Sequence, residues 1–188
     1  MPVKITGVTT AYKGWGQYLI ASVQLPDGQV IKREVEDHGN AAAILPYDAE
    51  RRKALLVKQF RTPMLYAGGV LHSLEAIAGR VDEGEPADTA RREAMEEAGL
   101  RITTLEPVVT SWSMPGVSTE RISLYLASYS AEDRIAAGGG LAEEHEDIEV
   151  LEFDLTELAA MADRGELEDM KTFALLQTLR LRRPDLFA

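Results

Sequence analysis

Apolar and polar residues alternate in the N-terminal part of the chain, as they do in strands that bury one face. Between residues 3 and 35, the runs Tyr18 to Leu25 and Val30 to Val35 lie on either side of the turn signal Pro26-Asp27-Gly28. This pattern predicts an antiparallel β element at the N-terminus.

A second group of short apolar runs follows. Ala41 to Leu45 and Ala54 to Phe60 are separated by the polar stretch Asp48 to Lys53, which predicts a β-hairpin. A short strand from Leu74 to Ala78 is expected to lead into a glycine turn at Gly79. Further strands are predicted at Ile102 to Thr110, Ile122 to Tyr129 and Val150 to Phe153.

Two helices are predicted near the C-terminus, from Thr156 to Arg164 and from Thr172 to Arg182. In the second, Phe173, Leu176 and Leu179 recur at helical spacing, so we expect them to face the core. The order of mixed strands and helices predicts an α/β/α sandwich with a mixed sheet.

The stretch from Ala78 to Leu100 carries the strongest chemical signal. It passes from a glycine turn through an acidic loop into a helix that starts at Pro86 and ends at Gly99, where a left-handed C-cap is expected. Glu93, Glu96 and Glu97 share one face of this helix, although like charges at this spacing cost a few tenths of a kcal/mol per pair. A solvated acidic face is the ordinary alternative. Clustered carboxylates also suit Mg²⁺, or Mn²⁺ as a substitute.

Composition narrows the function classes. The 188 residues suit one domain with a small appended element, and the chain lacks cysteine, which excludes disulfides and thiolate chemistry. No apolar run of about 18 residues or signal pattern is visible, so we expect a cytoplasmic protein without membrane partners. The net charge of −11 argues against nucleic-acid binding. It also means that an anionic substrate would need compensating metal cations.

The residues flanking the acidic face form a recognisable pattern. Gly79, Glu85, Arg92-Glu93, Glu96-Glu97 and Gly99 together resemble the Nudix box of hydrolases that act on nucleoside diphosphates linked to another moiety. Only six residues separate Glu85 from Arg92, one fewer than in the family pattern, and Ala94 fills the hydrophobic slot. The shortened box is similar to that of the branch that hydrolyses GDP-mannose.

The resemblance extends from about residue 15 to residue 182 and includes the related ADP-ribose pyrophosphatases. It implies the same Nudix α/β/α sandwich. It also implies an N-terminal β element at residues 1–40, used for dimerisation and nucleotide binding, and a hydrolase domain at residues 41–188. In the family the N-terminal strands reach the partner subunit, so a homodimer with shared sites is expected.

The resemblance implies roles for individual residues in the metal site. The Ala78 carbonyl, Glu93 and Glu97 would ligate the metal, and Glu146 from the acidic segment 143–149 would complete its shell. Glu96 would be a further ligand or a general base. Glu144 matches the loop glutamate that resembles the catalytic base of the ADP-ribose enzymes. Arg92 and Glu85 would form a structural ion pair.

Substrate contacts are expected at positions spread along most of the chain. Arg61 and Arg80 have guanidinium groups suited to clamping phosphate oxygens, although each also has an ordinary interpretation as a surface arginine. Trp15 falls where the family places an aromatic ring that stacks on the nucleobase, with strand-edge packing as the alternative. The other matching positions are Lys32, Arg33 and Glu34 on the nucleotide-binding strand, and Glu120 and Lys171, which hold the sugar or a phosphate.

The sequence therefore predicts metal-dependent hydrolysis of the pyrophosphate bond of a nucleotide sugar. GDP-mannose, giving GMP and mannose 1-phosphate, is the first choice, and ADP-ribose, giving AMP and ribose 5-phosphate, is the alternative. A nucleotide-sugar sensor without turnover is the alternative outside the enzymes. Such a protein would be expected to lose box glutamates, whereas Glu93, Glu96 and Glu97 are all present. Histidine gives no functional signal, and His38 and His72 are expected to be structural or exposed.

Overall fold

The computed structural model describes residues 2–141, 143 and 147–188. The chain forms two compact units: residues 1–41 with 110–122, and residues 42–109 with 123–188. We call them the first unit and the second unit. Within the described ranges, no helix is long and apolar enough to cross a membrane.

The first unit contains a three-stranded antiparallel sheet in the order β1-β2-β3. Its strands are β1 (Lys4–Lys13), β2 (Gln17–Gln24) and β3 (Val30–Asp37). The turn before β3 uses Gly28 at φ 90°, a backbone conformation that glycine adopts without steric cost. All residues of β1 are exposed, and Ala21 is the one fully buried position in the three strands. The predicted N-terminal antiparallel strands are present.

The second sheet has seven strands and lies at the centre of the second unit. Five of its strands follow the order β10-β5-β4-β9-β8. Two short strands extend it, because β6 pairs with β5 and β7 pairs with β4. The strands are β4 (Asn40–Asp48), β5 (Lys53–Phe60), β6 (His72–Glu75), β7 (Ile77–Val81), β8 (Glu106–Trp112), β9 (Arg121–Ser128) and β10 (Glu149–Asp154).

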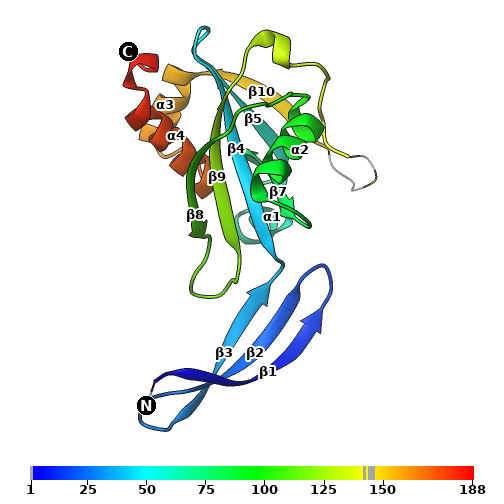
Figure 1. Cartoon of the computed structure of the whole chain (residues 1–188), viewed down its shortest axis with the longest axis vertical. Helices are drawn as coiled ribbons and strands as arrows, with labels where there is room; N and C mark the ends of the chain where they lie inside the picture. Colours follow the sequence, from blue (N-terminus) through cyan, green and yellow to red (C-terminus); the bar gives the residue numbers. More distant parts are fainter. Residues whose placement is uncertain (1, 142, 144–146) are drawn as a thin grey trace. The chain divides into compact units, whose positions relative to one another are not determined.

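Helices cover both faces of the sheet in the second unit. Figure 1 shows α2 (Pro86–Ala98) on one side, and α3 (Leu155–Asp163) and α4 (Met170–Arg182) on the other. A short helix α1 (Thr62–Gly68) follows β5, and two 3₁₀ turns lie at Ala131–Asp133 and Pro184–Leu186. The predicted α/β/α sandwich with a mixed sheet is confirmed.

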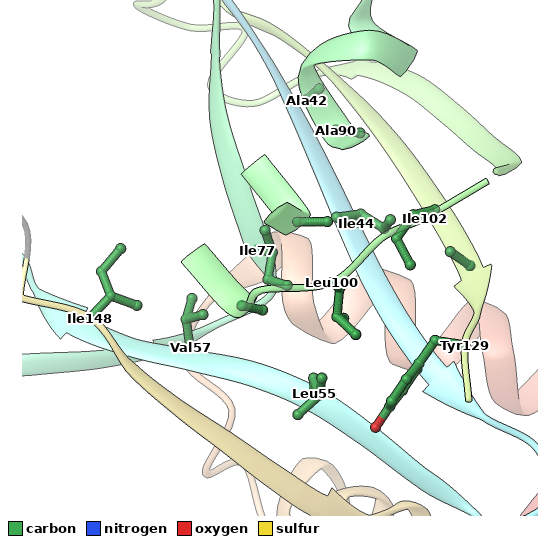
Figure 2. Packing of buried hydrophobic residues seen from close by; sticks show 13 residues of the cluster. Ala42, Ile44, Leu55, Val57, Ile77, Ala90, Leu100, Ile102, Tyr129 and Ile148 are labelled. Atoms are coloured by element: carbon green, nitrogen blue, oxygen red, sulfur yellow. The ribbon is translucent and has the colours of Figure 1, made fainter. Parts of the chain in front are cut away.

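The core beneath α2 explains why this helix lies where it does. Ala90, Ala94 and Ala98 are fully buried at helical spacing and pack in one cluster with strand residues such as Ile44 and Ile77 (Figure 2). Because alanine has a short side chain, the helix backbone can approach the sheet closely. Side chains alternate along a strand, so the fully buried residues next to Ile44 face the opposite layer, which contains α3 and α4.

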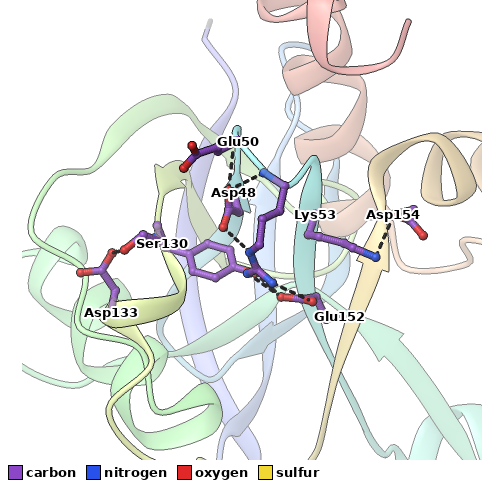
Figure 3. Close-up of polar contacts among 9 residues, drawn as sticks. Asp48, Glu50, Lys53, Ser130, Asp133, Glu152 and Asp154 are labelled. Atoms are coloured by element: carbon purple, nitrogen blue, oxygen red, sulfur yellow. Dashed lines mark hydrogen bonds and ion pairs between the residues drawn. The ribbon is translucent and has the colours of Figure 1, made fainter.

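Ion pairs close the hairpin between β4 and β5. The buried carboxylate of Asp48 accepts the Arg51 backbone N–H at 2.9 Å and the Arg51 Nε at 2.6 Å. The Arg51 guanidinium also binds Glu152 on β10 at 2.8 Å, and Glu152 accepts the Tyr129 hydroxyl at 2.9 Å (Figure 3). The charge of Asp48 is thereby compensated, and the hairpin turn is fixed to β10 and, through Glu152, to the residue that follows β9.

The structure departs from the sequence prediction in several local details. The strand predicted from Ile102 to Thr110 is found at Glu106–Trp112, and helix α1 was not predicted. Phe173 was expected to face the core, but its exposed fraction is 37%, and Thr172 is fully buried in its place. The Thr172 hydroxyl accepts the Ala76 backbone N–H, which draws that face of α4 toward the sheet. The predicted strand from Leu74 to Ala78 is divided between β6 and β7 at the same residue, Ala76.

Candidate metal and phosphate site

The loop-helix stretch brings Glu93 directly against Gly79. A Cβ atom added to Gly79 would lie 1.8 Å from Glu93 Oε1 and 2.1 Å from Glu93 Cδ. Only a residue without a side chain therefore leaves room for this carboxylate. Glu93 is 8% exposed, so the glycine turn forms a cradle for a largely buried negative charge.

Glu97 lies one turn further along the same face of α2. It is 2% exposed, and its Oε2 accepts the backbone N–H of Ala78 at 3.4 Å. Glu93 and Glu97 are thus both directed at β7, beside two consecutive residues of that strand. This arrangement brings together three of the four positions for which the sequence predicted metal ligation: Ala78, Glu93 and Glu97.

Glu96 has a different environment from the other two box glutamates. Its Oε2 pairs with Arg92 Nη1 at 2.7 Å, and the other guanidinium nitrogen of Arg92 pairs with Glu93 at 2.7 Å. Burial opposes the charge on Arg92, but Glu93 and Glu96 outweigh it and raise the pKa of the guanidinium. Arg92 therefore braces two glutamates of its own helix, and the expected ion pair with Glu85 is replaced by these contacts.

The glycine-rich segment is anchored on the C-terminal end of α2. The N–H groups of Gly139 and Gly140 donate to the carbonyls of Glu97 and Glu96, at 2.8 and 3.2 Å, and so satisfy helix-end acceptors. Gly138 is required for two reasons. A Cβ there would lie 2.3 Å from the Glu97 carbonyl oxygen, and its φ of +75° is a conformation that other residues rarely adopt. Beyond the segment, the buried Ile148 donates to Gly139 at 3.3 Å. Glu144 and Glu146, predicted in the catalytic and metal roles, lie outside the described residues.

Arg61, predicted to contact substrate phosphates, and Lys171, predicted to hold the sugar or a phosphate, converge on one buried carboxylate. Arg61 binds Glu75 in a bidentate arrangement, with Nε to Oε1 at 2.7 Å and Nη2 to Oε2 at 2.9 Å. Lys171 also contacts Glu75 Oε2, and it reaches Asp169 Oδ1 at 3.0 Å. Glu75 ends β6 and is 3% exposed.

The electrostatics of this network show that Glu75 is firmly ionised. Burial acts to raise the pKa of its carboxyl group, but the hydrogen bond from Arg61 and the charge of Lys171 outweigh it and lower the pKa to about 2. The hydrogen bond to Glu75 also raises the pKa of Arg61, and the charges of Glu97 and Asp169 act in the same direction. The Arg61 guanidinium is thus within electrostatic reach of the box helix.

The remaining predicted substrate residues have separate surroundings. Arg80, on β7, binds Asp82 at 2.6 Å. In the first unit, Lys32 donates to the Ser22 hydroxyl, Arg33 donates to the Lys32 carbonyl at 2.9 Å, and Glu34 accepts the Tyr18 hydroxyl at 2.7 Å. Trp15 stacks on His38, and Glu120 contacts the same histidine at 3.1 Å. The structure therefore brings Trp15 and Glu120 together around His38.

The donor set at β7 and α2 fits a hard divalent cation in part. Two buried carboxylates supply the oxygen-rich chemistry that Mg²⁺ and Mn²⁺ prefer, and the Ala78 backbone lies beside one of them. In the ranges that the structure describes, no three His, Cys, Asp or Glu side chains are grouped so that they could hold a metal ion. Glu93 and Glu97 thus require backbone, water or substrate oxygens, or a further carboxylate, to complete a coordination shell.

Comparison with known proteins agrees with this geometry. The model of the NUDIX domain matches residues 37–176, which is most of the chain. The chain therefore belongs to the Nudix family, and it is a Nudix pyrophosphohydrolase. Members of this family generally need a divalent metal.

Curated relatives make the comparison more specific. The chain is 42% identical over 161 residues to a GDP-mannose pyrophosphatase of Cronobacter sakazakii, covering 83% of this chain and 82% of the relative. It is also 42% identical over 156 residues to a GDP-mannose pyrophosphatase of Citrobacter koseri, covering 81% of each. Among solved structures, an ADP compounds hydrolase superposes with a TM-score of 0.79 over 98% of this chain and 96% of that chain. Its sequence identity of 15% shows a shared fold alone.

Sequence reasoning missed Glu75, which binds two of the predicted substrate residues, Arg61 and Lys171. The residue sits in an apolar run, Leu74-Glu75-Ala76-Ile77, which was read only as a strand. A charged residue inside a buried strand is unusual unless it is paired, so this isolated glutamate was the available signal. Its partners lie 14 and 96 residues away, and no local pattern connects them.

Replacement of Gly79 by alanine should weaken metal binding. The new methyl group would occupy the space of the Glu93 carboxylate, so we expect the affinity for Mn²⁺ to fall by about tenfold or more. Isothermal titration calorimetry of the Gly79→Ala protein measures this. Gly68→Ala is the matched control, because its Cβ would have only an ordinary contact at 3.8 Å. Unchanged Mn²⁺ affinity in folded Gly79→Ala protein would remove the cradle from the site.

Replacement of Glu75 by glutamine should change how the free energy of unfolding depends on pH, because it removes the charge of this carboxylate. Because the pKa is lowered from 4.5 to about 2 on folding, the carboxylate stabilises the fold above pH 4.5 and loses this effect as the pH falls toward 2. We expect Glu75→Gln to lower the free energy of unfolding by about 3 kcal/mol at pH 7, and the difference to shrink in acid.

Urea unfolding of both proteins between pH 7 and acid tests this expectation. Glu166→Gln is the matched control, since Glu166 also binds an arginine through both oxygens but is exposed. It should change stability far less than Glu75→Gln does, because solvent screens an exposed pair. Equal effects of the two substitutions would show that burial does not strengthen the Glu75 network.

Proposed function

We propose that this chain hydrolyses the pyrophosphate bond of a nucleotide sugar with Mg²⁺, converting GDP-mannose and water to GMP and mannose 1-phosphate. One observation carries the proposal: the Gly79 cradle holds Glu93 beside Glu97 on the Nudix helix of a chain that is 42% identical to GDP-mannose pyrophosphatases. Mn²⁺ is expected to substitute for Mg²⁺, since both take oxygen ligands.

In this proposal Glu93, Glu97 and the Ala78 carbonyl hold the cation. A bound divalent cation would neutralise charge on the phosphate oxygens and lower the pKa of a coordinated water. Glu96, which is paired with Arg92, serves as a further ligand or as a base acting through water. The assignments of Glu144 and Glu146 rest on the family resemblance.

The charges around Glu75 support a metal requirement. Arg61 and Lys171 contribute two positive charges, but Glu75 and Asp169 contribute two negative charges within the same contacts. The network as a whole is therefore close to neutral. Its side chains can orient phosphate oxygens by hydrogen bonding, but the network has little net positive charge with which to attract them. Compensation of a diphosphate in a protein of net charge −11 then falls mainly to the divalent cation.

The first unit is proposed to bind the nucleotide and a second subunit. Its long strand β1 exposes Ile5, Val8 and Tyr12 by 65%, 55% and 68%, and a three-stranded sheet with one buried position has little core of its own. A second copy of the chain would bury these side chains. Trp15 is 74% exposed and suits stacking on a nucleobase, and Lys32, Arg33, Glu34 and Glu120 lie in the same unit.

Glu97→Gln should abolish turnover while the fold is retained. The substitution keeps the shape of the side chain but removes one of two buried negative charges at the metal site, so we expect kcat/KM for GDP-mannose with Mg²⁺ to fall by about 10³-fold. The matched control on the same helix is Asp88→Asn, because the Asp88 carboxylate is exposed and pairs with Arg91 at 3.0 Å. Normal activity in Glu97→Gln would exclude this helix from the mechanism.

The substrate itself is tested by comparing kcat/KM for GDP-mannose, GDP-glucose and ADP-ribose in Mg²⁺. We expect GDP-mannose to be preferred over ADP-ribose by about tenfold or more, which corresponds to about 1.4 kcal/mol of transition-state binding. A tenfold preference for ADP-ribose would assign the chain to the alternative reaction, which yields AMP and ribose 5-phosphate. Binding without hydrolysis of any of them would favour the sensor.

A further inference from the structure

His38, at the end of β3, lies between two carboxylates and against an aromatic ring. Its Nδ1 contacts Glu36 Oε1, and its Nε2 lies 3.1 Å from Glu120 Oε1. The imidazole stacks on the Trp15 indole with 5.0 Å between ring centroids and an interplanar angle of 24°. All four residues belong to the first unit.

The contact geometry favours a protonated imidazole. A neutral histidine has one N–H, so one of the two carboxylates would face a nitrogen lone pair, whereas the imidazolium donates from both nitrogens. Burial opposes the positive charge, but the hydrogen bonds to Glu36 and Glu120 outweigh it, and the pKa of His38 is raised. A cation stacked on indole is also favoured by the negative face of the ring.

The backbone around His38 is built to hold this arrangement. A Cβ on Gly16 would lie 2.9 Å from His38 Cβ and 3.0 Å from the Asp37 carbonyl oxygen, so glycine lets the Trp15 turn approach. The loop that carries Glu120 is fixed to β3 by two backbone hydrogen bonds, from Glu36 N to Val117 O at 2.8 Å and from Thr119 N to Glu36 O at 2.9 Å. The cluster is therefore specified by tertiary contacts from three segments.

The exposure of the cluster is uneven. The side chains of His38 and Glu120 are 19% and 17% exposed, whereas Trp15 is 74% exposed. The histidine thus supports the indole from within the unit and leaves most of the aromatic residue accessible to solvent. This is the arrangement expected of a stacking platform whose orientation is fixed before a ligand binds.

We propose that His38, as the imidazolium, is a positioning residue that fixes Trp15 and Glu120 for the nucleoside part of the substrate. This inference rests on the proposed function, in which both residues contact the nucleotide sugar. The charged groups that face His38 are Glu36 from β3 and Glu120 from the loop before β9, while Trp15 from the β1–β2 turn is uncharged. The Asp37 carboxylate is engaged by the Thr119 hydroxyl at 2.7 Å.

The pH dependence follows from the direction of the shift. Because the pKa of His38 is raised by folding, the two charged contacts are present at low pH and are lost as the pH rises through the folded-state value. Above that value the neutral ring keeps one donated hydrogen bond, and Trp15 and Glu120 are held less firmly. Substrate affinity should therefore weaken in that range, with little change in the chemical step.

Fluorescence tests the pairing without any substrate. In a Trp112→Phe background Trp15 is the single tryptophan, and its emission should be quenched as the neighbouring imidazole becomes protonated between about pH 9 and about pH 5. We expect a midpoint above the ordinary histidine pKa, no titration in His38→Asn, and an unchanged titration in the control His72→Asn. A titration that persists in His38→Asn would overturn the proposal.

Kinetics then separate positioning from a merely structural role. We expect His38→Asn to raise the KM for GDP-mannose about fivefold at pH 7 with kcat within about twofold. His38→Arg keeps the cation at every pH, so it should restore KM and remove its pH dependence. A fall in kcat with unchanged KM, or no rescue by arginine, would overturn the positioning role. If no variant or wild-type protein cleaves nucleotide sugars but the fluorescence titration holds, the proposed function fails while the pairing of His38 with Trp15 stands.

Discussion

The arrangement of α2 against β7 in the second unit depends on two negatively charged glutamates that are both buried. Glu93 and Glu97 stand one turn apart on α2 and face β7, and their exposed fractions are 8% and 2%. Two carboxylates removed from water in this way are costly unless cations compensate them. The surrounding features follow from this requirement: a glycine that makes room, an arginine that braces the helix, and an alanine face that brings the helix close to the sheet.

The same requirement explains how an acidic protein can act on a diphosphate. Its cations near the box helix are largely committed, since Arg92 is bound to Glu93 and Glu96, and Arg61 and Lys171 are bound to Glu75. These pairs position the side chains but leave little net positive charge. In our proposal, a divalent cation held by Glu93 and Glu97 would supply the missing charge, which agrees with the general metal requirement of the family.

Much of the fold and the box could be predicted from the sequence because their signals are local. The alternation in β2 and β3, the polar turn between β4 and β5, and Pro86 and Gly99 at the ends of α2 all lie within a few residues of the structure they determine. The environments of Glu75 and His38 could not be predicted in this way. Their partners among the predicted substrate residues come from distant segments. Only the folded chain therefore shows that an isolated glutamate, and a histidine expected to be structural or exposed, each contact two of these residues.

The most direct test of the central claim is the position of a bound metal. Anomalous diffraction from crystals of the protein grown with Mn²⁺ locates the ion without reference to activity. We predict a peak about 2 Å from carboxylate oxygens of both Glu93 and Glu97, adjacent to Ala78. A peak elsewhere, with these two carboxylates unliganded in an active protein, would contradict the account.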